Sequence, residues 1–268
     1  MKIEAADIPP HPLDRYIKTE RLPSTFCPGC GIGIAFGCLL NAIKICKLPL
    51  EDIVIVSGIG CTARASGYFS GDAFHTVHGR AIPFAIGVET TNPKLEAIVF
   101  SGDGDLFSIG GNHFIHAARR NADITVICIN NSIYGMTGGQ TAPTTPPGAT
   151  TTTTPKGATL RPFNLAHLAK GAGAIYVSRF PVTRQSQLTR SITEAINKDG
   201  FSFVEIISPC PTIFGSKNVG RMSEFYRQLR ENIVPITDEQ RENPEKAPLV
   251  FEPKKGFLTI PYGIFVNK

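Results

Sequence analysis

Short apolar runs alternate along the chain with segments whose apolar residues recur at helical spacing. Five runs rich in Val, Ile and Phe are typical of buried parallel strands, and they lie within residues 51–60, 94–105, 124–131, 174–180 and 201–209. Helices are predicted over residues 34–46, 79–93, 105–121, 163–173 and 183–200. This alternation predicts an α/β fold, with a mainly parallel sheet and helices on both faces.

Three segments fall outside this alternation. Residues 1–25 read as an irregular N-terminal arm, and residues 26–215 as the α/β domain. Residues 216–268 are expected to hold one helix over 223–232 and an extended, Pro-rich C-terminal tail that lies over the domain or over a partner. Within the domain, residues 136–161 are rich in Thr, Pro and Gly and lack periodicity. A loop of this length is usually functional or mobile, so we expect it to close over a substrate, the alternative being a surface linker.

Composition excludes several classes of function. The chain has 268 residues, enough for one large domain, and its net charge of +5 is scattered without a basic run. This distribution does not indicate nucleic-acid binding but suits docking to an acidic protein. No apolar run reaches the roughly 20 residues of a membrane span. The N-terminal residues do not resemble a secretion signal, so we expect a cytoplasmic location with reduced cysteines.

Polar residues follow consecutive predicted strands. Asp103 lies in the Gly-Asp-Gly sequence after the second strand, and Asn131 ends the third. The carboxyl ends of parallel strands share one edge of a sheet, where ligands bind. A carboxylate, an amide oxygen and a nearby carbonyl suit Mg²⁺, while Gly102 and Gly104 allow a phosphate to approach the backbone. Taken singly, these features are an ordinary turn and a helix cap; together they favour a metal-diphosphate site.

Four of the seven cysteines lie in segments rich in Gly or Pro, outside the predicted helices and strand interiors. Cys27 and Cys30 have CxxC spacing, and Cys61 and Cys210 each lie beside Gly or Pro near a strand end. A zinc ribbon would need a second CxxC or paired histidines, which the sequence lacks. Four thiolates from separate loops suit an iron–sulfur cluster, although the residues alone leave zinc or no metal open. Cys38, Cys46 and Cys128 lie inside predicted helices or strands and read as packing residues.

The Gly-Asp-Gly sequence followed by two asparagines resembles the motif with which thiamine enzymes bind Mg²⁺ and thiamine diphosphate. The resemblance implies a thiamine diphosphate-binding fold in which Asp103, Asn131 and the Ile133 main chain bind the metal. It also implies a set of residues that line the cofactor: Ile59, Gly60, Cys61, Thr62, His78, Gly104, Asp105, Gly135 and Met136.

Between Phe26 and Pro211, the order of CPGCG, a later GC, GDGD and a final Cys resembles the β subunits of 2-oxoacid:ferredoxin oxidoreductases. The resemblance implies a [4Fe-4S] cluster on Cys27, Cys30, Cys61 and Cys210. It implies thiamine-dependent oxidative decarboxylation with coenzyme A as acyl acceptor and ferredoxin as electron acceptor. The segments FHTVHGRA and IGGNHFIHAARRN are most similar to the 2-oxoglutarate branch, but they do not separate it from pyruvate, branched-chain or indolepyruvate enzymes.

The same resemblance implies partners. Thiamine enzymes use a Glu against the aminopyrimidine, and this family takes it from an α subunit; the present sequence offers no convincing candidate. We therefore expect a site at an α/β interface, an (αβ)2 or larger assembly, and γ or δ subunits in some complexes.

Two residues are candidates for substrate contacts. Arg64 follows Cys61 by three residues, so its guanidinium could pair with the distal carboxylate of 2-oxoglutarate or only with a surface acid. The resemblance places His78 beside the cofactor. His75, His113, His116 and Arg80 read as structural. Two competing hypotheses stay open: a non-oxidative thiamine-dependent decarboxylase or transferase subunit with a structural metal at the cysteines, and a non-enzymatic electron-relay subunit.

Overall fold

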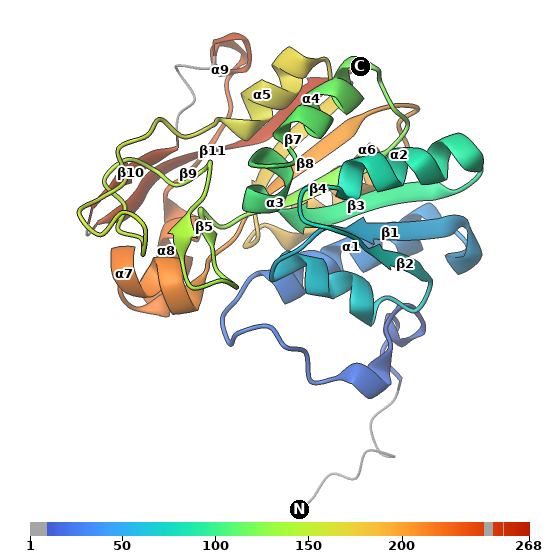
Figure 1. Cartoon of the computed structure of the whole chain (residues 1–268), viewed down its shortest axis with the longest axis horizontal. Coiled ribbons are helices and arrows are strands. Elements are labelled where there is room, and N and C mark those ends of the chain that lie inside the picture. Colours follow the sequence, from blue (N-terminus) through green and yellow to red (C-terminus); the bar gives the residue numbers. More distant parts are fainter. Residues whose placement is uncertain (1–9, 244–248, 254) are drawn as a thin grey trace, which may run out of the picture.

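A central sheet organises the computed structural model, which describes residues 10–243, 249–253 and 255–268 (Figure 1). Its strand order is β10-β11-β7-β8-β4-β3-β1-β2. Six neighbouring strands run parallel: β2 (Asp72–His75), β1 (Ile53–Ser57), β3 (Glu96–Gly102), β4 (Thr125–Asn130), β8 (Ser202–Ile207) and β7 (Tyr176–Pro181). The strands β1, β4, β7 and β8 are buried at every position, which explains their apolar sequences.

Helices cover both faces of this sheet. On one face, α1 (Ile32–Cys46) and α6 (Gln185–Ile196) pack on Ile53, Ile55 and Ile127. On the other face, α2 (Ala81–Thr91), α4 (Gly111–Arg119) and α5 (Leu165–Ala172) pack on a second core that includes Val54, Val99 and Val126. Alternate strand residues therefore enter different cores, as a two-sided sheet requires. The α/β fold with helices on both faces is confirmed.

The helix predicted over 105–121 is wrong as a single element. It consists of α3 (Asp103–Phe107) and α4, separated at Ser108–Gly110. A Cβ at Gly110 would lie 2.6 Å from the Asp105 carbonyl oxygen, so the chain turns sharply where the glycine allows close approach. The edge strand β2, exposed at all four positions, has no counterpart in the sequence-based assignment.

The C-terminal segment does more than lie over the domain. After a π-helix (Pro211–Gly215), α7 (Ser216–Asn218) and α8 (Met222–Glu231), the strand β9 (Ile233–Pro235) and α9 (Asp238–Glu242) lead to β10 (Val250–Glu252) and β11 (Gly256–Asn267). The strand β11 pairs antiparallel with β7 and extends the main sheet. The predicted extended tail is thus corrected to a strand that lies between β10 and β7 in the sheet. The expected helix 223–232 is present as α8.

The N-terminal arm and the long loop are packed against the domain. Residues 1–9 of the predicted arm lie outside the described residues, and the rest forms two 3-10 turns (Asp14–Tyr16 and Thr19–Arg21) with Tyr16 buried. Further 3-10 turns are Leu50–Asp52 and Thr62–Tyr68. The loop 136–161 starts beside a short hairpin of β5 (Ile133–Tyr134) and β6 (Gln140–Thr141). No helix within the described ranges is long and apolar enough to cross a membrane.

Candidate active site

The carboxyl ends of β1, β3 and β4 surround a small cavity of about 60 Å³. Every residue predicted to line the cofactor borders it, together with the three predicted metal ligands: Ile59, Gly60, Cys61, Thr62, His78, Asp103, Gly104, Asp105, Asn131, Ile133, Gly135 and Met136. A space of this size suits a metal ion with a few oxygen ligands. Ile59 and Met136 are 40% and 47% exposed, so this wall opens to solvent.

Asp103 is a buried carboxyl group at the start of α3. Its side chain is 2% exposed, and burial raises its pKa to about 7. Its Oδ2 accepts a hydrogen bond from the Ser132 backbone N–H at 3.1 Å and another from the Thr144 hydroxyl. Thr144 belongs to the loop 136–161, which therefore reaches the predicted metal ligand. These two donors fix the orientation of the Asp103 carboxyl group.

Asn131 supplies a buried oxygen that lacks a partner. Within the described part of the chain, its Oδ1 has no hydrogen-bond partner. The next residue, Ser132, has a φ of +61°, in the left-handed region that side chains rarely adopt. The turn from Asn131 to Ile133 is therefore held in a costly shape that places an unpaired oxygen beside a buried acid. These features fit a hard cation such as Mg²⁺.

Asp105 lines the same cavity, but both of its carboxylate oxygens already bind groups of the protein. Its Oδ1 accepts hydrogen bonds from the backbone N–H of Ile59 at 3.1 Å and of Gly79 at 2.8 Å, and its Oδ2 accepts one from the Ser101 hydroxyl at 2.8 Å. His78 Nδ1 lies 3.1 Å from the same Oδ1, without the alignment of a hydrogen bond. Asp105 thus ties together the loops that follow β1, β2 and β3.

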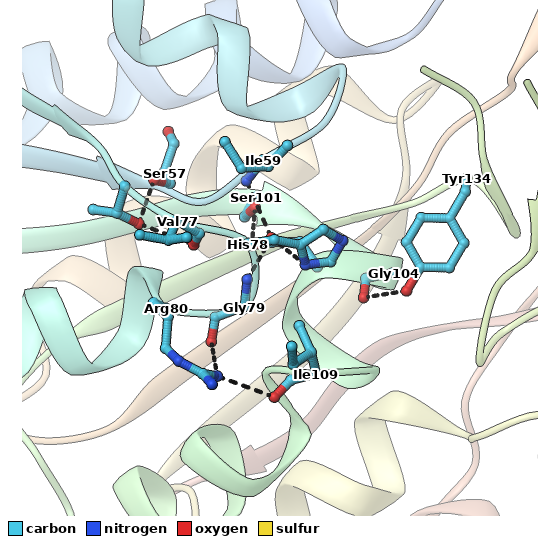
Figure 2. A network of polar contacts seen from close by, with 12 residues as sticks. Ser57, Ile59, Val77, His78, Gly79, Arg80, Ser101, Gly104, Ile109 and Tyr134 are labelled. Atoms are coloured by element: carbon cyan, nitrogen blue, oxygen red, sulfur yellow. Dashed lines mark hydrogen bonds and ion pairs between the residues drawn. The ribbon is translucent and has the colours of Figure 1, made fainter. Parts of the chain in front are cut away.

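Tyr134 covers Gly104. Its hydroxyl donates a hydrogen bond to the Gly104 carbonyl oxygen at 2.8 Å, and a Cβ at Gly104 would lie 2.4 Å from its ring (Figure 2). The Tyr134 ring centroid is also 6.0 Å from that of His78. Glycine is therefore required at position 104 by an aromatic ring of the same chain. The sequence-based prediction expected a phosphate to approach this backbone.

The four predicted cluster cysteines border one larger cavity of about 320 Å³, together with Arg64. A Cβ at Gly135 would lie 3.5 Å from Cys210 Sγ and 3.8 Å from Cys61 Sγ, so these sulfurs flank a single point. Cys27 is exposed, Cys30 and Cys61 are half-buried, and Cys210 is buried. The fold thus brings together cysteines that are up to 183 positions apart, from Cys27 to Cys210.

The thiols influence one another electrostatically. Burial raises the pKa of the Cys30 thiol to about 11; a hydrogen bond with the Ile32 backbone opposes this shift, and the thiols of Cys210, Cys61 and Cys27 add to it. Burial also raises the pKa of Cys61, with further contributions from Cys210 and Cys27.

In the described ranges, no group of three or more His, Cys, Asp or Glu side chains is close enough to hold one metal ion. Cys38 and Cys128 are buried, and Cys46 is half-buried, in α1 and β4.

The two cavities share a wall. Cys61, Asn131, Gly135 and Met136 border both of them. A group held beside Asp103 and a group held by the four thiols would therefore be separated only by these residues.

Comparison with known proteins decides the family. Residues 58–206 match the model for "Thiamine pyrophosphate enzyme, C-terminal TPP binding domain". The chain is 48% identical over 227 residues to a 2-oxoglutarate synthase subunit KorB from Methanocaldococcus jannaschii, covering 84% of each chain. It is 49% identical over 232 residues to that subunit from Archaeoglobus fulgidus, covering 87% of this chain and 82% of the relative. The chain belongs to the β subunits of the 2-oxoacid:ferredoxin oxidoreductases.

A solved structure of this family has the same fold. The 2-oxoglutarate:ferredoxin oxidoreductase from Magnetococcus marinus, with 2-oxoglutarate, coenzyme A and succinyl-CoA bound, aligns with a TM-score of 0.81 and 31% identity. The alignment covers 96% of this chain and 84% of that one. As a β subunit, the chain is one part of a multi-subunit oxidoreductase. These relatives support the oxidative prediction and not the non-oxidative alternative.

Three residues of the candidate site were missed by sequence reasoning. Ser132 and Thr144 hold Asp103, and Tyr134 covers Gly104. Ser132 and Tyr134 carry a weak signal, since they flank the predicted ligand Ile133. Thr144 lies in a segment with many threonines, and only the folded loop singles it out.

Proposed function

We propose that the chain is the β subunit of a 2-oxoglutarate:ferredoxin oxidoreductase. The reaction converts 2-oxoglutarate and coenzyme A to succinyl-CoA and CO2, with two electrons passed to ferredoxin, or runs in reverse. The names of the KorB relatives and the ligands in the Magnetococcus marinus structure support this substrate. The observation that carries the proposal is the wall shared by the Asp103 cavity and the four-cysteine cavity.

The Asp103 cavity is the proposed site of Mg²⁺ and of the diphosphate end of thiamine diphosphate. Asp103, the Asn131 side chain and the Ile133 carbonyl would hold the metal. The partnerless Asn131 Oδ1 and the raised pKa of Asp103 support this ligand set, because a divalent cation would satisfy both groups. A cavity of about 60 Å³ does not hold a whole cofactor, so the remainder would extend along the exposed side chains of Ile59 and Met136.

The four-cysteine cavity is the proposed site of a [4Fe-4S] cluster. Four thiols border it, which is the ligand number that such a cluster requires. Its volume of about 320 Å³ also distinguishes the candidates. Zinc–sulfur bonds of about 2.3 Å would draw four thiolates around a single ion, whereas a cubane of eight atoms needs a larger space. The cavity has room for the larger group.

Thiamine diphosphate, when bound, supplies a carbon nucleophile and an electron sink for decarboxylation of a 2-oxoacid. The chain's own residues would orient the reactants. Asp105 holds the loops that present Ile59 and His78 to the cavity, and we assign His78 to a cofactor or substrate contact. Arg64 borders the cysteine cavity, where its guanidinium could bind the distal carboxylate of 2-oxoglutarate.

An exposed apolar face beside the cavity is the proposed docking site of the α subunit. It consists of Ile59, Phe74, Val77, Phe84 and Ile109, each at least 40% exposed. The rings of Phe74 and Phe84 lie 6.4 Å apart, and Ile59 also borders the cavity, so the face continues into the site. A soluble chain rarely exposes such a patch unless a partner covers it. The α subunit would close the cavity here and supply the aminopyrimidine Glu.

The test separates the two sites in the anaerobically purified α/β complex. Asp103→Ala should abolish Mg²⁺-dependent binding of thiamine diphosphate and leave the brown colour of the iron–sulfur cluster. Cys30→Ser should reduce the iron content and the visible absorbance, while the matched control Cys46→Ser should change neither. A colourless wild-type complex that contains zinc in place of iron and still decarboxylates 2-oxoacids would overturn the proposal in favour of the non-oxidative alternative.

A further inference from the structure

We propose that Arg179, Glu205 and Asn130 are positioning residues that set the geometry of the metal-binding turn. These three residues and Ser132 are called the Arg179 network. The inference rests on the proposed function, because it treats Asn131 and Ile133 as Mg²⁺ ligands. Arg179 and Glu205 lie 48 and 74 positions after Asn131 in the sequence. They form an ion pair deep in the sheet, where the network begins.

Arg179 on β7 and Glu205 on β8 are register partners, and both are fully buried. Arg179 Nε donates a hydrogen bond to Glu205 Oε2 at 2.7 Å, and its Nη2 donates one to Asn164 Oδ1 at 2.6 Å. Burying two charges costs more than burying apolar side chains of the same volume, so packing alone does not account for this pair. A role in orienting a neighbouring group does account for it.

Asn130, the last residue of β4, is that neighbouring group. Its Nδ2 donates a hydrogen bond to Glu205 Oε1 at 2.7 Å, and its Oδ1 accepts one from the Ser132 backbone N–H at 3.2 Å. The same N–H lies 3.1 Å from Asp103 Oδ2. Ser132 is the residue with a φ of +61° between Asn131 and Ile133. The Arg179 network therefore ends on the backbone that separates two proposed metal ligands.

The order of donors and acceptors fixes each orientation. A guanidinium only donates hydrogen bonds, and an ionised carboxylate only accepts them. Both Glu205 carboxylate oxygens accept hydrogen bonds, Oε2 from Arg179 and Oε1 from Asn130, so the Asn130 amide turns its NH2 group to Glu205 and its oxygen to Ser132. A neutral amide in place of Glu205 could also donate, and Asn130 could then flip and present NH2 to the Ser132 N–H. The buried charges thus determine which way Asn130 points.

The experiment measures Mg²⁺ rather than turnover. The Mg²⁺ concentration that gives half-saturation of thiamine diphosphate binding would be determined by titration calorimetry on the α/β complex. We expect Asn130→Ala to raise this concentration about 10- to 100-fold, the usual cost of losing a group that orients metal ligands, with binding restored at excess Mg²⁺. Glu205→Gln should shift it in the same direction. Ser178→Ala is the matched control, because Ser178 is buried on β7 and bonds Ser191 at 2.6 Å outside the network.

The outcomes are distinguishable. A tenfold or larger shift in Asn130→Ala, with Ser178→Ala within twofold of wild type, supports the positioning role. This inference alone is overturned if wild type and a folded Asn130→Ala complex need the same Mg²⁺ concentration for half-saturation while Asp103→Ala fails to bind the cofactor. Wild type that binds thiamine diphosphate without Mg²⁺ overturns the proposed metal site and this inference with it. Should Glu205→Gln not fold, the Asn130→Ala result decides.

Discussion

Gly58 and Asp105 offer a direct test of how the site is assembled. An ideal Cβ built on Gly58 would lie 2.0 Å from Asp105 Oδ2, and its three nearest atoms all belong to that carboxylate. The backbone of Gly58 is not in the left-handed region, so alanine is disfavoured there only by this clash. We therefore expect Gly58→Ala and Asp105→Ala to be strongly coupled, with the second change relieving the first.

The expected changes in the free energy of unfolding follow from the hydrogen bonds of Asp105 and from its clash with a side chain at position 58. Asp105→Ala leaves the backbone N–H groups of Ile59 and Gly79 without their acceptor, and at about 1–3 kcal/mol each this should lower the free energy of unfolding by about 2–6 kcal/mol. Gly58→Ala alone should cost about 1–3 kcal/mol through overpacking. Once the carboxylate is absent, alanine at position 58 should stabilise the fold by about 0.4–1 kcal/mol, because it lowers the conformational entropy of the unfolded chain. The coupling free energy is then about 1.5–4 kcal/mol.

Guanidinium unfolding of the full chain, followed by far-UV circular dichroism, would compare wild type, both single variants and the double variant. The double variant should be no less stable than Asp105→Ala. If Gly58→Ala costs the same in both backgrounds, the carboxylate is not in contact with this loop, and the role assigned to Asp105 is refuted.

Three further changes test other parts of the molecule. Burial, and then the charge of Asp123, raise the pKa of Glu96 from the ordinary 4.5 to about 7. The free energy of unfolding should therefore fall by up to about 3 kcal/mol as pH rises from 4.5 to 7. Glu96→Gln should remove this slope when urea unfolding is measured at several pH values. Arg64→Met should raise the KM for 2-oxoglutarate about 10- to 100-fold in steady-state assays, through loss of a charge-assisted hydrogen bond, and leave any activity on pyruvate unchanged. Phe84→Glu should prevent co-purification with the α subunit, because a charge would be buried in the proposed interface.

Each of these has a contradicting result. The same pH slope in Glu96→Gln and wild type would assign the dependence to other groups. Equal KM increases for 2-oxoglutarate and pyruvate would remove Arg64 from carboxylate recognition. Leu160→Glu is the control, because Leu160 is 75% exposed and lies outside that face. The α subunit must dock elsewhere if Phe84→Glu assembles normally or if both variants lose assembly equally.

The core of the fold was predictable because its strands are buried on both faces. Continuous apolar runs such as the one over β4 have no other stable environment in a chain of this composition. The strands β2 and β11 were missed because each is defined by its pairing with a neighbouring strand more than by its own apolar content. All four residues of β2 are exposed, and β11 contains Pro261 and Gly263, which read as tail residues. Their place is set by β1 and β7, which the local sequence does not reveal.

The ligand candidates were predictable for a related reason, since Asp103 and Asn131 stand directly at strand ends. The local sequence pattern could not show which partner each polar group binds. Asp105 lies two residues from Asp103 and borders the same cavity, yet its oxygens bind Ile59, Gly79 and Ser101. Which of two neighbouring acids is held by backbone N–H groups, and which is left as the proposed metal ligand, depends on loops that only the folded sheet brings together.

The Arg179 network carries a sequence signal of a different kind. Arg179 in AIYVSRF and Glu205 in FSFVEIIS are each the sole charged residue of an otherwise uncharged strand. A lone charge in a buried strand is prohibitively costly, so two such strands with opposite charges predict that the charges meet. The pairing of β7 with β8 satisfies that requirement. The link to Asn130 needs one further fact, the adjacency of β8 to β4, which brings the carboxylate beside the residue that precedes the proposed metal ligand. Strand order, rather than any single residue, thus connects the buried ion pair to the chemistry.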